Sequence, residues 1–116
     1  MSAPSVSFAG LPTAAVPRPG QIAVLGVDHA TPYDSGKPSH SAGAPAALRA
    51  ALSGYNRLPD HYDFDIGGLR PDTAVDCGDV PGDPADPPGN REAIMRAVRA
   101  LLDASAIPVV LGGDDS

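Results

Sequence analysis

The sequence has few aromatic residues and a single cysteine. Aromatic residues make up 4% of the 116 residues, and tryptophan is absent. A core must therefore be built from Ala, Val, Leu and Ile, which suits the closely packed layers of an α/β fold better than a β-sandwich. Cys77 is the only cysteine, so an internal disulfide is excluded, and one thiol alone does not make a zinc site. We expect Cys77 to be a small, buried packing residue.

Basic residues are also scarce. Eight Lys and Arg against fourteen Asp and Glu give a formal net charge of −6, and the basic residues are scattered along the chain. The sequence therefore lacks the positive patch of a nucleic-acid-binding protein, and its charge argues against binding to anionic membranes. A cationic small-molecule substrate fits the negative charge.

Long apolar runs are missing as well. No apolar run reaches the length that crosses a bilayer, and residues 1–20 lack the cationic and apolar regions of a signal peptide. We therefore expect a cytoplasmic protein with no nucleic-acid partner and no membrane partner. Residues 1–20 mix Ser, Pro, Ala and Gly without a period, which predicts an extended or disordered N-terminal arm. Residues 21–116 are expected to belong to a single domain.

Short apolar runs alternate with helical patterns along residues 21–116. Three such runs, at 21–28, 73–77 and 107–111, predict strands. The first has the pattern of a strand buried on both faces, and the second is also of the buried type. Two stretches predict helices, at 44–55 and 90–105. The order strand, helix, strand predicts a parallel sheet and an α/β fold.

The helix predicted at 90–105 has the clearest pattern. Asn90 is a good N-cap for it. Four apolar side chains recur at helical spacing and predict one apolar stripe: Ile94, Val98, Leu101 and Leu102. The stripe is expected to pack against the sheet.

Two segments have less regular patterns. Residues 29–43 form a long, turn-rich loop, and loops of this length inside compact domains are usually functional or disordered. Its His29 and His40 either face a substrate or are solvated. Residues 60–68 alternate like a strand, but their aspartates depress that propensity. Two of those aspartates would share one face of such a strand, where they either bind an ion or face solvent.

Aspartates follow the predicted strands. Asp28 ends the first run, Asp76 and Asp79 lie at the end of the second, and Asp114 and Asp115 follow the third. Because parallel strands end at one edge of the sheet, where α/β proteins bind ligands, we expect these carboxylates to gather there. Gathered carboxylates need a counter-charge or a network of donors, and an oxygen-preferring divalent metal such as Mn²⁺ or Mg²⁺ would supply it. The alternative role of each aspartate is to cap a helix or close a turn.

Three segments resemble, in order, those of one family. The segment GVDHATPYDSGKPSHSAGAPAALR, residues 26–49, resembles the opening signature of the arginase, agmatinase and guanidinobutyrase family, the ureohydrolases. DCGDV, residues 76–80, resembles the strand-end Gly-Asp motif of that family, and IPVVLGGDDS, residues 107–116, resembles its Leu-Gly-Gly-Asp-His-Ser box. The similarity covers residues 21–116, and the order of several motifs is far more specific than any one of them.

The resemblance implies a fold and an activity. The fold would be the arginase-like three-layer α/β sandwich with a parallel sheet, of which this chain is the N-terminal part. A complete subunit of such an enzyme would hold two Mn²⁺ ions, or Ni²⁺, and a bridging hydroxide. The hydroxide would attack a guanidino compound such as agmatine and release urea and an amine. The family also implies a homo-oligomer, a trimer or a hexamer.

Two departures from the family pattern concern the metal site. Asp115 stands where the family has a metal-binding histidine, and because a carboxylate also binds Mn²⁺, Asp115 is the one metal ligand assigned to this chain. The other ligands of the family lie in an Asp-x-His-x-Asp motif and a later Asp-x-Asp motif, both of which would follow Ser116. No catalytic residue is assigned, and the 116 residues alone are expected to be inactive. The alternative is a non-catalytic structural or regulatory subunit with the same fold.

Overall fold

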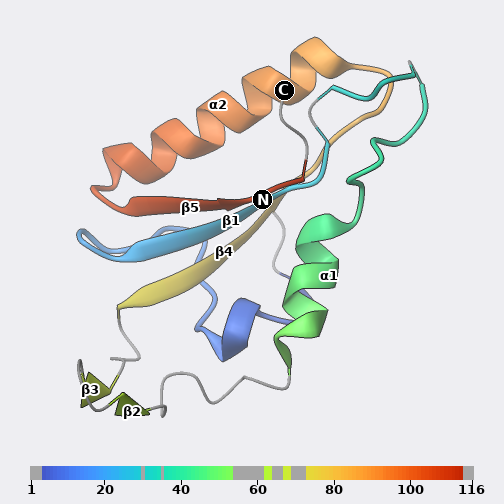
Figure 1. Cartoon of the computed structure of the whole chain (residues 1–116). Coiled ribbons are helices and arrows are strands. Elements are labelled where there is room, and N and C mark those ends of the chain that lie inside the picture. Colours follow the sequence, from blue (N-terminus) through green and yellow to red (C-terminus); the bar gives the residue numbers. More distant parts are fainter. Residues whose placement is uncertain are drawn as a thin grey trace.

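The computed structural model of the chain describes four segments with their side chains, and the backbone of two short strands: residues 4–29, 31–34, 36–53 and 73–113, and the pairs 62–63 and 67–68. A parallel sheet lies at the centre, with helices on both sides of it (Figure 1). The short strands β2 (Tyr62–Asp63) and β3 (Gly67–Gly68) pair antiparallel with each other. None of the helices in the described segments is long and apolar enough to cross a membrane.

The sheet contains three parallel strands in the order β4-β1-β5. The central strand is β1 (Ile22–Val27), flanked by β4 (Ala74–Val80) and β5 (Ile107–Leu111). This arrangement confirms the α/β fold with a parallel sheet that the alternating sequence pattern predicts. Strand β4 runs farther than predicted, so Asp76 lies inside the strand and not at its end.

Helices cover opposite faces of the sheet. Helix α1 (Ala44–Ala51) lies on one face and the longer α2 (Pro87–Asp103) lies on the other (Figure 1). The chain leaving β1 therefore turns to one face, and the chain leaving β4 turns to the opposite face. In open α/β sheets this reversal opens a crevice at the carboxyl ends of the two strands.

Helix α2 begins earlier than the sequence pattern predicts. Its N-cap is Asp86, whose carboxylate accepts a hydrogen bond from the Gly89 N–H at 3.1 Å, and Pro87 occupies the first helical position. Proline suits this position because its missing N–H would have no partner there. The Asn90 side chain serves instead to hold the preceding loop, since it bonds to the backbone N–H and the carbonyl of Asp83, each at 2.8 Å.

The core lies between the sheet and α2. It contains buried side chains of β1, β4 and α2, among them Leu25, Val75 and Leu101, and the buried Cys77 confirms the packing role predicted for it. Burial raises the pKa of the Cys77 thiol, and the neighbouring Asp76 carboxylate adds to this shift. Most of the predicted apolar stripe of α2 packs on this core, but Leu102 is exposed.

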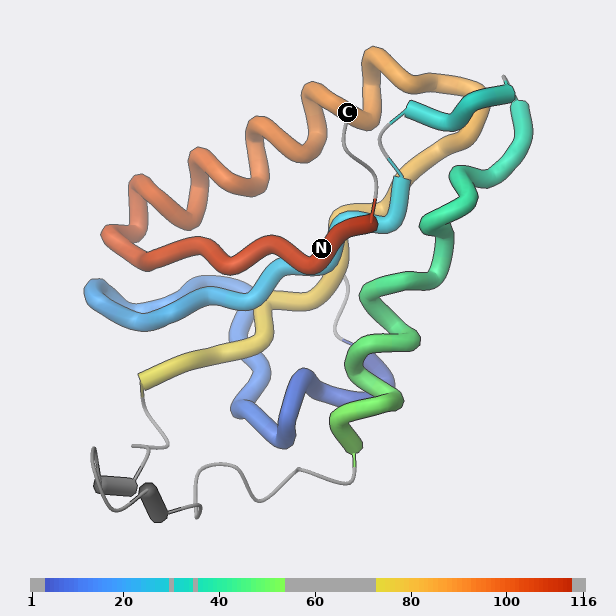
Figure 2. Tube along the Cα trace, in the orientation of Figure 1, coloured from blue at the N-terminus to red at the C-terminus, as the bar shows by residue number. Residues whose placement is uncertain are grey.

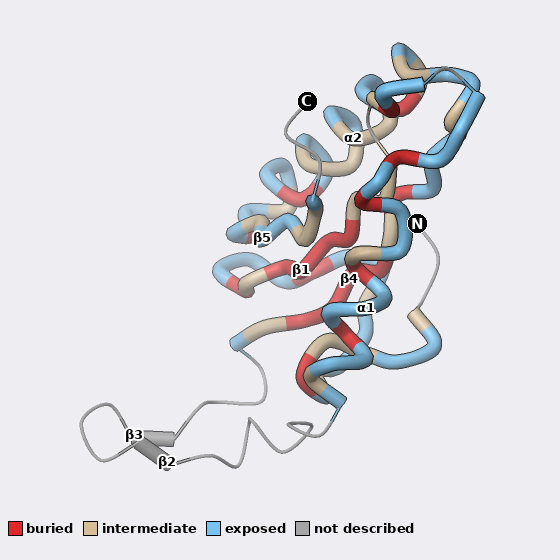
Figure 3. Tube along the Cα trace, turned by 45° about the vertical axis from the view of Figure 1, so that its right-hand side comes forward, coloured by how far each residue is buried: buried red, intermediate tan, exposed pale blue. Residues whose placement is uncertain are grey.

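Strand β5 forms one edge of the sheet. Its Ile107, Val109 and Val110 side chains are exposed, although they belong to an apolar run. Figure 3 shows the contrast between this exposed edge and the buried residues of β1 and β4. Strand β5 is exposed because only β1 pairs with it among the described residues.

The segment 4–20 runs along the opposite edge of the sheet, beside β4 (Figure 2). A 3₁₀ turn, η1 (Phe8–Gly10), buries Ala9, and Thr13 then pairs with Asp76 as an isolated parallel bridge. The Asp76 N–H donates to the Pro12 carbonyl at 2.8 Å, and the Asp76 carbonyl accepts from the Ala14 N–H at 3.1 Å. This segment therefore covers the outer edge of β4.

Candidate functional site

The carboxyl ends of the three strands meet at one edge of the sheet, as predicted. Asp28 follows β1, Asp79 lies near the end of β4, and Gly112 follows β5. Asp114 and Asp115, the pair that the sequence places next, lie outside the described residues. The candidate site is therefore described from the side chains around this edge.

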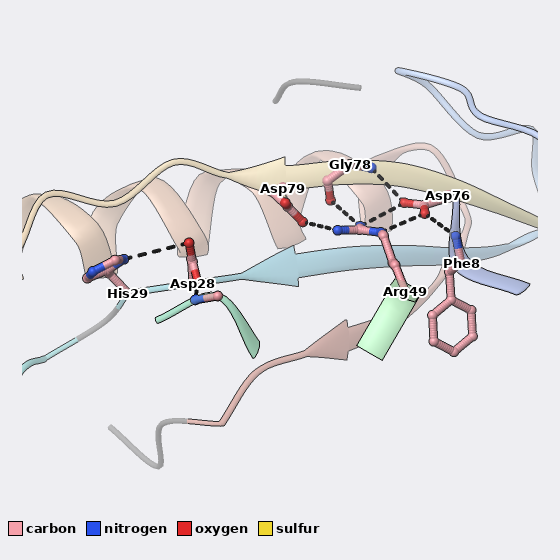
Figure 4. A network of polar contacts seen from close by, with 8 residues as sticks. Phe8, Asp28, His29, Arg49, Asp76, Gly78 and Asp79 are labelled. Carbon is pink, nitrogen blue, oxygen red and sulfur yellow. Dashed lines mark hydrogen bonds and ion pairs between the residues drawn. The ribbon is translucent and has the colours of Figure 1, made fainter. Parts of the chain in front are cut away.

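Arg49 occupies the centre of these contacts, although the sequence pattern alone did not single it out. It lies in the last turn of α1, and only 2% of its side chain is exposed. Its Nε and Nη2 donate to the two oxygens of Asp76, each at 2.9 Å, and its Nη1 donates to Asp79 Oδ1 at 2.5 Å. Figure 4 shows the guanidinium between the two carboxylates. Arg49 thus joins α1 to β4 through a bidentate pair and a second ion pair.

The Asp76 carboxylate is fully occupied by donors. Besides Arg49, its Oδ2 accepts from the Phe8 N–H at 2.8 Å and its Oδ1 accepts from the Gly78 N–H at 2.9 Å. Burial alone would raise the pKa of Asp76, but the hydrogen bonds from Arg49, Phe8 and Gly78 hold the pKa below its ordinary value. Burial alone would lower the pKa of Arg49, but its bonds to Asp76 and Asp79 raise it. Both groups are therefore charged in the folded chain at neutral pH.

The lowered pKa of Asp76 predicts a loss of stability in acid. The pKa of this carboxylate is lower in the folded than in the unfolded state. Its contribution to the free energy of unfolding is therefore complete above about pH 4, the ordinary pKa range of an aspartate. The contribution is lost as the pH falls through the folded-state pKa. Urea unfolding followed by circular dichroism between pH 2 and 6 measures this loss. The free energy of unfolding of Asp76→Asn should change less steeply with pH, by the slope that corresponds to uptake of up to about one proton. Equal slopes for both proteins would contradict the prediction.

Asp28 and His29 lie just past the carboxyl end of β1. One Asp28 oxygen accepts from the Gly43 N–H, and the other lies 4.0 Å from His29 Nδ1. The His29 side chain is 12% exposed, and its buried Nε2 has no hydrogen-bond partner among the described residues. The ring lies against the loop after β4, where a Cβ on Gly82 would come within 2.4 Å of the His29 Cβ. His29 is therefore largely enclosed and not solvated, and a substrate-facing role for it stays a prediction.

His40 and Tyr33 stack in the outer part of the same loop. Their ring centroids are 5.0 Å apart and their planes differ by 7°. Both residues are exposed, and 86% of Tyr33 is accessible. His40 is thus on the surface, in agreement with the solvated alternative.

The end of the same loop lies against the Gly-Gly turn after β5. Ser39 and Ser41 are buried, and their hydroxyls are 2.9 Å apart. A Cβ on Gly113 would lie 2.7 Å from the Ser41 Cβ and 3.4 Å from the Ala44 Cβ. The turn that leads to Asp114 therefore needs glycine for a close approach to this loop.

The described residues do not form a metal site by themselves. They contain no group of three or more His, Cys, Asp and Glu side chains close enough to share an ion. The counter-charge of Asp76 and Asp79 is Arg49, so the expectation that a divalent cation neutralises these two carboxylates is wrong. The assigned metal ligand, Asp115, lies outside the described residues and remains a prediction.

Comparison with known families agrees with this arrangement of motifs. The family model described as "Arginase: Arginase family" matches residues 20–116. The chain belongs to the arginase family. No curated protein matches it. The match to the family covers β1, both helices, β4 and β5, and therefore every side chain of the candidate site apart from the N-terminal segment.

Proposed function

We propose that the chain is the N-terminal part of a metal-dependent ureohydrolase that hydrolyses a guanidino compound, such as agmatine, to urea and an amine. Membership of the arginase family supports the reaction type. The observation that carries the proposal is the position of Gly113, where the turn leading to Asp114 and Asp115 lies at the carboxyl edge against Ser41. Ligands of open α/β sheets bind just outside this edge.

The metal would be Mn²⁺, with two ions in a complete subunit, and Ni²⁺ is the alternative. Asp115 would be the ligand from this chain, because it stands in the Gly-Gly-Asp box where the family has a histidine. The chemistry that Mn²⁺ would supply when bound is a water of lowered pKa, the nucleophile for the guanidinium carbon. The motif Asp-x-His-x-Asp does not occur in this sequence, so the remaining ligands would come from elsewhere and the 116 residues alone would be inactive.

The charges of the described side chains would attract the substrate of such an enzyme. Arg49 pairs with Asp76 and Asp79, and Asp28 accepts a hydrogen bond from the Gly43 N–H. The three carboxylates therefore outnumber the one guanidinium and leave an excess of negative charge near the carboxyl edge. A guanidinium substrate is cationic and is drawn to negative potential. The proposal therefore fits the acidic sequence as well as the family.

An activity assay of a complete subunit that carries this sequence tests the proposal. With Mn²⁺ bound, it should release urea from agmatine or a related guanidino compound. Asp115→Ala should lower both kcat/KM and Mn²⁺ affinity by at least about tenfold, since even outer partners of metal ligands cost that much. Asp34→Ala is the matched control, because the Asp34 side chain is exposed and pairs with the exposed Lys37 at 3.6 Å, and it should change neither quantity.

A second candidate, a non-catalytic structural or regulatory subunit, is favoured by one observation. Asp115 replaces the metal-binding histidine of the family. A complete subunit that binds no Mn²⁺ or Ni²⁺ and releases no urea would support this candidate, whereas two bound ions would count against it. Both candidates would be cytoplasmic homo-oligomers, trimers or hexamers.

A further inference from the structure

The segment beside β4 does more than cover a sheet edge. We propose that residues 4–14 form a strap that is latched by the Asp76 carboxylate through the Phe8 N–H, so that the strap seals the buried Arg49 from water. This role of the strap does not depend on whether the protein hydrolyses a guanidino compound. It gives residues 4–14 a defined conformational role at the ionic cluster of the chain.

The latch is a single hydrogen bond to a charged acceptor. The Phe8 N–H donates to Asp76 Oδ2 at 2.8 Å, across 68 positions of the sequence. The same oxygen accepts from Arg49 Nε, so one carboxylate holds both α1 and the strap. Two backbone bonds at Asp76, with Pro12 and Ala14, continue the contact along the edge of β4. The strap is therefore fixed at one strand residue by side chain and backbone together.

The strap also lies beside the guanidinium of Arg49. A small cavity of about 160 Å³ lies between the strap and α1, and it is lined by Pro4, Ser5, Val6, Ala46, Arg49, Ala50 and Asp79. Figures 1 and 4 show the strap on the face of the sheet that carries α1, with Phe8 next to Asp76. Arg49 is 2% exposed with the strap in place. Low exposure strengthens the pairing of Arg49 with Asp76, because water no longer screens it.

The sequence around Phe8 offers a matched pair of variants. Phe8→Pro removes the N–H together with the ring, whereas Phe8→Ala removes the ring and keeps the N–H. Proline is tolerated at the start of the η1 turn, and Ser7 before it has the extended backbone (φ −78°, ψ 151°) that precedes proline. A comparison of the two variants therefore isolates the latch from the packing of the ring.

Hydrogen exchange measured by NMR tests the proposal. The reporters are the amides of Ala14 and Asp76, which bond across the strap contact, and the Leu25 amide of β1 reports global unfolding. Phe8→Pro should exchange at Ala14 and Asp76 at least about tenfold faster than Phe8→Ala, as loss of a bond to a charged group requires. The Leu25 amide should differ by less than about twofold. Equal exchange at Ala14 and Asp76 in the two variants would overturn the proposal.

A measurement on the unaltered chain keeps the test decisive if Phe8→Pro does not fold. The groups that face the Asp76 carboxylate are Arg49 from α1, the Gly78 N–H from β4 and the Phe8 N–H from the strap. Asp79 of β4 is linked to it through Arg49. Protonating Asp76 in acid removes the acceptor charge. Protection of the Ala14 amide should then fall at a higher pH than protection of the Leu25 amide. Loss of both protections at one pH would refute the latch.

Discussion

Replacing Arg49 with methionine is expected to lower the free energy of unfolding by about 3–5 kcal/mol. Methionine fills much of the same space, but it leaves the buried carboxylate of Asp76 without its cation. Breaking a buried ion pair from one side is costly because the remaining charge keeps its desolvation penalty and loses its partner. A domain of this size has a total stability of about 5–15 kcal/mol, so the loss is a large fraction of it.

Urea unfolding at pH 7 followed by circular dichroism measures this effect, since the chain has no tryptophan. Arg96→Met is the matched control, because Arg96 is 73% exposed and lies 4.0 Å from Glu92 in an i,i+4 pair. It should cost less than about 0.5 kcal/mol. Arg49→Lys should fall between the two, since an ammonium group cannot reproduce the bidentate contact. Similar losses for Arg49→Met and Arg96→Met would show that the buried cluster does not stabilise the fold.

Gly26→Ala is expected to lower the free energy of unfolding by about 1–3 kcal/mol, and more if the sheet cannot adjust. A Cβ at Gly26 would lie 1.8 Å from Asp79 Oδ1 and 2.9 Å from the Cβ of Pro45. Neither neighbour moves freely, because Asp79 is bound to Arg49 and Pro45 is buried in the first turn of α1. The substitution must therefore either push α1 from the sheet or break the ion pair.

Gly112→Ala is the control for this substitution. Gly112 lies just past the end of β5, whereas Gly26 lies inside β1. Nothing would lie within 4 Å of a Cβ on Gly112, and its φ is not in the left-handed region. Its effect should stay within about 0.5 kcal/mol. The crystal structure of Gly26→Ala would reveal which neighbour moved. Stability within about 0.5 kcal/mol of the unaltered chain would mean that Asp79 is not held against β1.

The parallel sheet could be predicted from the sequence because its signal is local. Each strand is a short apolar run, and the helix between β4 and β5 has its own apolar period, so strand, helix and strand are recognised without knowledge of their contacts. The family resemblance rested on the order of the motifs, and the match over residues 20–116 confirms it at the level of the family. The exposure of β5 could not be predicted, because an apolar run does not indicate how many strands pair with it.

The contacts of Arg49 could not be predicted because they are distant along the chain. Arg49 and Asp76 are 27 positions apart, and Arg49 and Asp79 are 30 apart, so no local pattern joins them. A weak signal was present: Arg49 stands in an Ala- and Leu-rich helix with no acidic residue three or four positions away. Such an arginine has no acidic partner on its own helix, so any ion pair that it forms must be with another element. The aspartates were recognised, but a metal was expected where an internal guanidinium lies.

The exposed edge of β5 carries its own protection against association. The Ile107 N–H donates to the Gln21 carbonyl at 2.8 Å, and because successive N–H groups of a strand point to opposite sides, the N of Pro108 points away from β1. A proline nitrogen has no hydrogen to offer an incoming strand. Of the β5 backbone nitrogens that point away from β1, only that of Val110 carries a hydrogen. The side chains around it are apolar and exposed. A strand edge with few free backbone donors is a poor template for pairing with another strand, so Pro108 opposes association at this edge of the sheet.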